Sequence, residues 1–219
     1  MLRNIAIVDC AVKEPSHQCF NQFVERTQIP CSYHLVSTHG IGSLETLKHI
    51  SAIIILGSYS HVHERLSWQI ELSNFCLKKL NEQIPVLGIC FGHQLMIDKL
   101  GGTIDFISSE NNKQQGVREV MFNHDFGDIL KDDKKYFIVS HKCEVKSAPP
   151  DLIAIASSSL IKFEVVAHKK LPFIGIQAHP EASKQFIKST LENSISDNCL
   201  QNARISGDQF LDSFIKKYL

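Results

Sequence analysis

The sequence predicts an α/β fold in three layers: a mostly parallel central sheet, helices on both of its faces, and a small antiparallel extension. In the first hundred residues, short apolar runs alternate with segments of helical periodicity, as in parallel sheets with crossover helices. After Thr103 the pattern changes to short strands separated by turn-rich segments. Because no repeat or linker divides the 219 residues, we expect a single domain over 1–219.

Each element of the first half has its own signal. Apolar runs predict strands at 5–9, 32–35, 52–56 and 85–89, and helical spacing predicts helices over 16–28, 41–50 and 68–80. Pro30 ends the first helix, and Gly101-Gly102 ends the helix that follows the fourth strand. We expect Asp9, at the end of the first strand, to be structural, as a cap or turn former.

The second half is predicted to return to the main sheet. Its strands are expected at 116–122, 136–140, 152–156, 163–167 and 173–177. Closing helices are expected over 183–193 and 208–219. In the last helix, Ser206 or Asp208 is the expected N-cap. Its buried stripe is expected to contain Phe210, Leu211, Phe214 and Ile215.

Composition argues against several classes of protein. The 23 Lys and Arg residues balance the 23 Asp and Glu residues, so we expect neither a nucleic-acid nor a membrane surface. The apolar runs are too short to span a bilayer, and we expect no signal peptide at the start of the chain. Seven cysteines with no C-x-x-C pair predict reduced thiols in a cytoplasmic protein.

The most informative motif is a cysteine between two glycines, Gly88-Ile89-Cys90-Phe91-Gly92, at the end of the fourth strand. It has the form of a nucleophile elbow, a tight strand-to-helix turn that lifts one side chain above the sheet. The following helix N-terminus favours a thiolate. By itself, however, Cys90 could equally be a small buried residue at a tight turn.

A second segment supplies the partners that a cysteine nucleophile needs. About ninety residues on, a predicted strand is followed by His179-Pro180-Glu181. In a nucleophile–base–orienter relay, His179 would take and return the thiol proton, and Glu181 would fix the imidazole. His179-Pro180-Glu181 alone could be a surface turn, but with Cys90 also at a sheet end, catalysis is favoured.

The expected chemistry is acyl transfer to Cys90 through a thioester. Ligands of open α/β sheets bind beyond the carboxyl ends of the strands, where Cys90, His179 and the loop after Gly57 should meet. That loop and the N–H of Phe91 could stabilise an oxyanion. His61-Val62-His63 is the nearest approach to a metal motif, but it lacks a third ligand, so we expect a loop and no metal or cofactor.

From Ile5 to about Phe186 the chain resembles the class I (triad) glutamine amidotransferase family. The likeness is greatest to the amidotransferase domain of GMP synthetase and its stand-alone relatives. Residues 87–95 resemble the family's nucleophile block, residues 174–181 its His-Pro-Glu block, and residues 139–145 its Ser-His segment near bound glutamine. The resemblance implies a flavodoxin-like fold and hydrolysis of the glutamine side-chain amide. The ammonia would pass to a synthetase domain or to a synthetase subunit in trans.

The resemblance also assigns roles to individual residues. It implies Cys90, His179 and Glu181 as the triad and the backbone N–H groups of Ser58 and Phe91 as the oxyanion hole. Substrate-binding residues would be Gly57, Gln94, Ser140 and His141. Without the resemblance, Gln94 could be an ordinary solvated helix residue and Ser140-His141 an ordinary turn.

The predicted oxyanion loop departs from the family pattern. The family usually has Gly-Gly-Pro, whereas this chain has Gly57-Ser58-Tyr59. Serine keeps the N–H, but it lacks the conformational freedom of glycine. Two alternatives therefore stay open beside the amidotransferase: a γ-glutamyl hydrolase acting on small γ-glutamyl amides, and a non-enzymatic binding module on the same scaffold.

Overall fold

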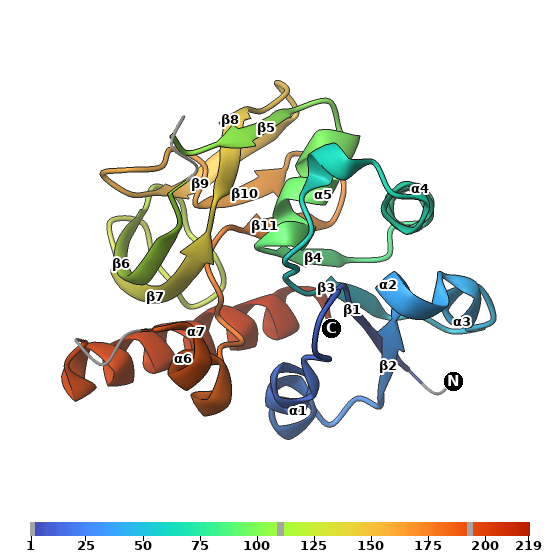
Figure 1. The fold of residues 1–219 in the computed structure, drawn as a ribbon, viewed down its shortest axis with the longest axis horizontal. Helices are drawn as coiled ribbons and strands as arrows, with labels where there is room; N and C mark the ends of the chain where they lie inside the picture. The colour runs from blue at the N-terminus through green and yellow to red at the C-terminus, as the bar shows by residue number, and fades with distance from the viewer. Residues whose placement is uncertain (1–2, 109–111, 192–194) are drawn as a thin grey trace.

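The computed structural model describes residues 3–108, 112–191 and 195–219. A sheet of nine strands crosses this part of the chain (Figure 1), in the order β2-β1-β3-β4-β11-β10-β9-β6-β7. Its parallel half contains β2 (Cys31–Leu35), β1 (Ile5–Asp9), β3 (Ala52–Ile55), β4 (Val86–Ile89) and β11 (Phe173–Ile176). Its antiparallel half contains β10 (Val165–His168), β9 (Leu152–Ser157), β6 (Gln114–Phe122) and β7 (Lys134–His141). The mostly parallel sheet and the antiparallel extension are confirmed.

Helices cover both faces of the sheet. On one face lie α1 (His17–Arg26) and the final helices α6 (Lys184–Thr190) and α7 (Asp197–Tyr218). On the other lie α2 (Val36–His39), α4 (Ser67–Asn81) and α5 (Phe91–Lys99), and α3 (Gly42–Glu45) and the 3-10 turn η1 (Val62–Glu64) complete the first half. This arrangement is the predicted three-layer α/β fold.

The strand residues divide between two cores because successive side chains of a strand point to opposite faces. Ile5 and Ile7 pack with Phe210 of α7, whereas Ala6 and Val8 pack in a second cluster with Leu72 of α4. Asp9 then ends β1, and its carboxylate accepts hydrogen bonds from the N–H groups of Ala11 at 2.8 Å and Ser16 at 2.5 Å. The structural role expected for Asp9 is therefore confirmed.

The last helix was predicted wrongly at its start. It begins at Asp197 rather than at 208, and Ser196 is its N-cap, accepting the N–H of Cys199 at 3.4 Å. Ser206 lies inside the helix and accepts the N–H of Tyr136 at 3.0 Å, so neither it nor Asp208 is a cap. The first turns expose mostly polar residues, which hides the helical periodicity that the prediction needed.

Other predicted elements differ in smaller ways. Of the stripe expected in α7, Phe210, Leu211 and Phe214 are buried, and Ile215 is only partly buried. The short helix expected within 41–50 is confirmed as the single turn α3, whereas α2, which precedes it, was not predicted. A two-stranded sheet of β5 (Thr103–Phe106) and β8 (Cys143–Ser147) was not predicted. The predicted end of the helix over 183–193 lies outside the described residues.

Candidate active site

The order β3-β4-β11 brings three distant segments to one edge of the sheet. The strands are parallel and in register, with Ile55 opposite Gly88 and Gly88 opposite Gly175. Their carboxyl ends therefore coincide, and the residues that follow, Gly57, Cys90 and His179, meet above the sheet. A Cβ placed on Gly57 would lie 2.9 Å from His179 Cε1 and 3.7 Å from Cys90 Cβ.

Cys90 has the strained backbone of a nucleophile elbow. Its φ is 50° and its ψ is −98°, a combination that is costly for a residue with a side chain. The flanking glycines are required for space. A Cβ on Gly88 would lie 2.6 Å from the Gly92 carbonyl, and one on Gly92 would lie 2.5 Å from the Ile55 carbonyl oxygen. Both glycines thus allow β4, β3 and the start of α5 to pack closely beneath Cys90.

His179 is held between a carboxylate and the thiol. Its Nδ1 lies 2.9 Å from Glu181 Oε1, and both side chains are buried. Burial by itself would lower the pKa of His179, but Glu181 and the hydrogen-bonded Cys90 thiol raise this pKa to about 10. An imidazolium that is stable at neutral pH can balance the charge of a Cys90 thiolate.

Helix α7 packs against the segment that carries His179 and Glu181. A Cβ on Gly207 would lie 2.5 Å from the Pro180 carbonyl oxygen, so only glycine allows the helix to come this close. The N–H of His179 also donates to the Ile138 carbonyl at 2.8 Å. These contacts fix the backbone on which His179 and Glu181 stand.

The loop after β3 has its own hydrogen-bond network. Ser58 Oγ donates to the Cys10 carbonyl at 2.6 Å and accepts the N–H of Ser60 at 3.0 Å. Ser58 does not have a positive φ, so its backbone here does not need the freedom of glycine. Across the edge of the sheet, Phe91 is the first residue of α5, where N–H groups have no acceptor within the helix.

Gln177 was not predicted as a site residue, yet it contacts the thiol. It is fully buried, and its Nε2 donates to Cys90 Sγ at 3.8 Å. Its Oε1 accepts from Gln94 Nε2 at 3.0 Å, and that nitrogen also donates to the Cys143 carbonyl at 2.8 Å. Gln94 is therefore buried beside the site, not solvated. The only signal in the sequence was a polar residue inside an apolar strand end.

Next to the hydrogen bonds of Gln177 and Gln94 lies a buried charge network that was not predicted from the sequence. Arg118 donates to Glu164 Oε1 at 2.9 Å and to His141 Nε2 at 3.1 Å. The other ring nitrogen of His141 lies 2.9 Å from the Cys143 carbonyl oxygen. Burial, and then Arg118, lower the pKa of His141 to about 3, so the ring is neutral with its proton on Nδ1. Ser140, the residue before it, is partly buried on β7.

The histidine pair after β3 does not assemble a metal site. His63 Nε2 lies 2.8 Å from the Ile104 carbonyl oxygen, and His61 Nδ1 lies 3.4 Å from Cys143 Sγ. Over residues 3–108, 112–191 and 195–219, no three His, Cys, Asp or Glu side chains form a group that could hold a metal ion. Within the same residues we find no helix with the length and hydropathy needed to cross a bilayer.

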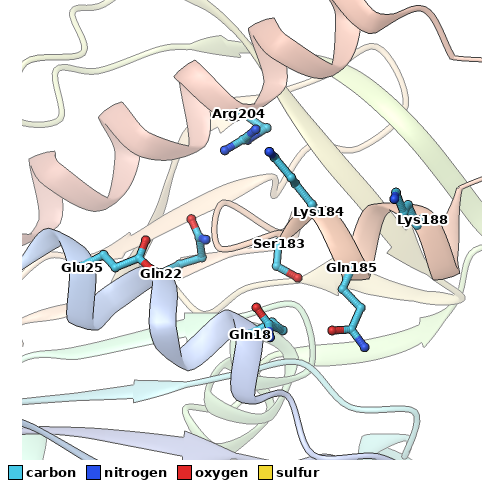
Figure 2. Close-up of a pocket in the computed structure, with 8 residues that line it drawn as sticks. All are labelled: Gln18, Gln22, Glu25, Ser183, Lys184, Gln185, Lys188 and Arg204. Atoms are coloured by element: carbon cyan, nitrogen blue, oxygen red, sulfur yellow. The ribbon is translucent and has the colours of Figure 1, made fainter.

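An open groove of about 800 Å³ lies elsewhere, between α1, α6 and α7 (Figure 2). Its lining is polar and includes three basic side chains. The lining residues are Gln18, Gln22, Glu25, Ser183, Lys184, Gln185, Lys188 and Arg204. Neither Cys90 nor His179 lines it, so the groove is separate from the thiol site.

The geometry around Cys90 suits attack on a carbonyl carbon. The thiol, the imidazole and the carboxylate form a hydrogen-bonded row at the sheet edge, as a nucleophile–base–orienter relay requires. Cys90 is 5% exposed and His179 6% exposed, so little of either side chain faces solvent.

Comparison with known proteins shows the family of the chain. Residues 6–197 match the family model described as glutamine amidotransferase class-I. The chain is 34% identical over 146 residues to the A subunit of the glutamine-hydrolysing GMP synthase of Methanococcus aeolicus, covering 65% of this chain and 71% of that protein. The corresponding protein of Methanocaldococcus jannaschii is 30% identical over 171 residues, covering 74% and 84%.

The comparison with solved structures shows the same fold. A crystal structure of a glutamine amidotransferase from Methylobacillus flagellatus superposes with a TM-score of 0.79 at 16% identity, covering all of this chain and 96% of the other. The family model extends over most of the sequence, and its match does not depend on the superposition. The chain belongs to the class I glutamine amidotransferase family.

Proposed function

We propose that this chain hydrolyses the side-chain amide of glutamine and passes the ammonia to a synthetase subunit in trans. The observation that carries the proposal is the row formed by Cys90, His179 and Glu181 at the carboxyl ends of β4 and β11. The archaeal relatives are each named as one subunit of a GMP synthase, which supports a separate synthetase partner. We further propose that residues 1–219 work as one domain of a cytoplasmic protein.

In the first half of the proposed reaction, the Cys90 thiolate attacks the side-chain carbonyl carbon of glutamine. The carbon–nitrogen bond breaks as the imidazolium of His179 gives its proton to the leaving nitrogen, and ammonia departs. The product is a γ-glutamyl thioester on Cys90. Glu181 stabilises the protonated imidazole, which is consistent with the raised pKa of His179.

In the second half, His179 takes a proton from water, and the resulting hydroxide attacks the thioester carbonyl. The carbon–sulfur bond breaks, glutamate leaves, and Cys90 returns to the thiolate beside an imidazolium. In both halves the backbone N–H groups of Ser58 and Phe91 donate to the oxyanion of the tetrahedral intermediate. Each such donor is worth about 10²- to 10³-fold in rate.

Four further residues are proposed to form the glutamine pocket: Gly57, Gln94, Ser140 and His141. Gly57 is supported by its position, since an added Cβ there would lie 2.9 Å from His179 Cε1. Gln94 is supported by its hydrogen bond to Gln177, the residue that donates to Cys90 Sγ. Both ring nitrogens of His141 are already bonded, so His141 would form the pocket wall and position Ser140.

The test is ammonia release from glutamine by the wild type and the Cys90→Ala variant. A glutamine-analogue electrophile should label Cys90 in the wild type, and the variant should neither be labelled nor release ammonia. Folded wild-type protein that leaves Cys90 unlabelled and releases no ammonia would reject the proposal in favour of a non-enzymatic binding module.

The exposed Tyr59 favours one second candidate. It stands where the family usually has a proline and is 60% exposed, so a larger leaving group could be accommodated there. The alternative is a γ-glutamyl hydrolase with the same triad. Turnover of glutamine compared with that of γ-glutamyl amines separates the two, and a strong preference for glutamine would reject the alternative.

A further inference from the structure

Two lysines, Lys13 and Lys113, gather on Tyr59 in the loop that follows β3, and the charge of a third lysine, Lys142, acts on Lys113. The Nζ of Lys13 lies 4.6 Å from the centre of the Tyr59 ring, and the Nζ of Lys113 lies 5.9 Å from it. The three segments are far apart in the sequence, since Lys13 follows β1 and Lys113 precedes β6. An exposed aromatic ring that holds two ammonium groups is a preorganised cationic surface.

This cationic cluster adjoins the thiol site. Tyr59 is two residues from Gly57, where an added Cβ would lie 2.9 Å from His179 Cε1 and 3.7 Å from Cys90 Cβ. The pKa of Lys113 is lowered, mainly by partial burial. Cys90 opposes this by raising the pKa, whereas the neighbouring charges of Lys142 and Lys13 lower it further. Lys113 therefore lies within electrostatic reach of the sulfur and of both other lysines.

The cluster has no acidic counterpart among the described residues. The ion pairs formed there include none from Lys13, Lys113 or Lys142. Two carboxylates of neighbouring segments are already bonded elsewhere, since Asp9 accepts backbone N–H groups and Glu64 accepts the N–H of His61 at 3.1 Å. Like charges held together without a counter-ion repel one another, and a bound anion would relieve this repulsion.

We propose that Lys113, assisted by Lys13 on the Tyr59 ring, forms a carboxylate-binding subsite that selects the α-carboxylate of the glutamyl substrate. This inference rests on the proposed function. Cys90 is almost fully buried, so the substrate's side-chain amide must point inward to reach the sulfur. The amino-acid end, two methylene groups behind the amide, is then placed nearer the surface, on the side of the ammonium groups.

The experiment compares glutamine with glutamine α-amide, which keeps the side-chain amide but replaces the charged α-carboxylate with a neutral carboxamide. We expect wild-type kcat/KM, measured from the side-chain-hydrolysed products, to favour glutamine by about 10- to 100-fold, the usual range for a charge-assisted contact. Lys113→Met should remove most of this preference by raising KM for glutamine with little change in kcat. Lys113→Arg should restore it.

Lys217→Met is the matched control. Lys217 also lies over an aromatic ring, with its Nζ 5.7 Å from the centre of Tyr218. It belongs to the end of α7. Leu219, which follows that helix, accepts a hydrogen bond from Arg3 just before β1, so Lys217 lies at the opposite end of the sheet. This variant should keep the wild-type preference for glutamine.

The outcomes separate the subsite from the proposed function. If the wild type hydrolyses glutamine and Lys113→Met keeps its preference, the subsite is wrong and the function stands. If the wild type hydrolyses neither compound, the function is wrong, and calorimetric binding of both compounds to Cys90→Ala tests the subsite alone. Tighter binding of glutamine that depends on Lys113 would support it, whereas equal affinity or no binding would reject it.

Discussion

Replacing Gly57 with alanine should impair the chemistry while leaving the fold intact. The added methyl group would lie 2.9 Å from His179 Cε1, whereas an ordinary contact begins near 3.4 Å, so the imidazole must move by about half an ångström. A displacement of 1 Å in an active site can cost about 10²-fold in rate, so half that displacement should cost roughly 10-fold. We therefore expect kcat for glutamine hydrolysis to fall by about one order of magnitude.

The assay is steady-state ammonia release, with thermal unfolding measured in parallel. Gly42→Ala is the matched control, because a Cβ there meets no atom within 4 Å and its φ is not positive. The control should keep wild-type kcat. If Gly57→Ala retains full kcat while remaining folded, the inference that Gly57 sets the position of His179 is wrong.

Two further predictions concern buried charges. Glu181→Gln removes the charge that raises the pKa of His179, so NMR titration of the ring should show a lower pKa, and kcat should fall by about 10²- to 10⁴-fold. Because the pKa of His179 is raised in the folded protein, the stability that Glu181 contributes should be fully present near pH 6 and lost as the pH rises through about 10. A difference between the urea midpoints of the wild type and Glu181→Gln that stays constant with pH would contradict this. Arg118→Met leaves the buried Glu164, whose pKa burial already raises, without its partner and should destabilise the protein by about 3–5 kcal/mol in urea unfolding. A loss of less than about 1 kcal/mol in the free energy of unfolding would show that Glu164 is neutral when Arg118 is absent.

The main architecture could be read from the sequence because its signals are local. The buried strands are continuous apolar runs, and the glycines at 88 and 92 mark the one turn where β4 and α5 crowd each other. The meeting of Cys90, His179 and Glu181 could be predicted because they follow strand ends, and parallel strands bring such ends to one edge. Which strands are neighbours, however, was settled only by the structure.

The missed features depend on contacts between distant segments. Gln177 looks like an isolated polar residue until β4 and β11 pair and bring its amide to the thiol. Arg118 lies on β6 and Glu164 just before β10, and no periodicity links them. The start of α7 was hidden because its buried positions before Phe210 are the small residues Ala203, Ser206 and Gly207, so large apolar side chains mark the buried face only from Phe210 onward.

The most direct test of the account is rapid quenching of the wild-type protein during turnover of glutamine, followed by mass analysis of the intact chain and its peptides. The account predicts a transient mass increase of one glutamyl group, located on Cys90 and removed by hydroxylamine, that forms no more slowly than ammonia is released. Ammonia release at the wild-type rate from a Cys90→Ala variant, or a glutamyl group on any other residue, would contradict it.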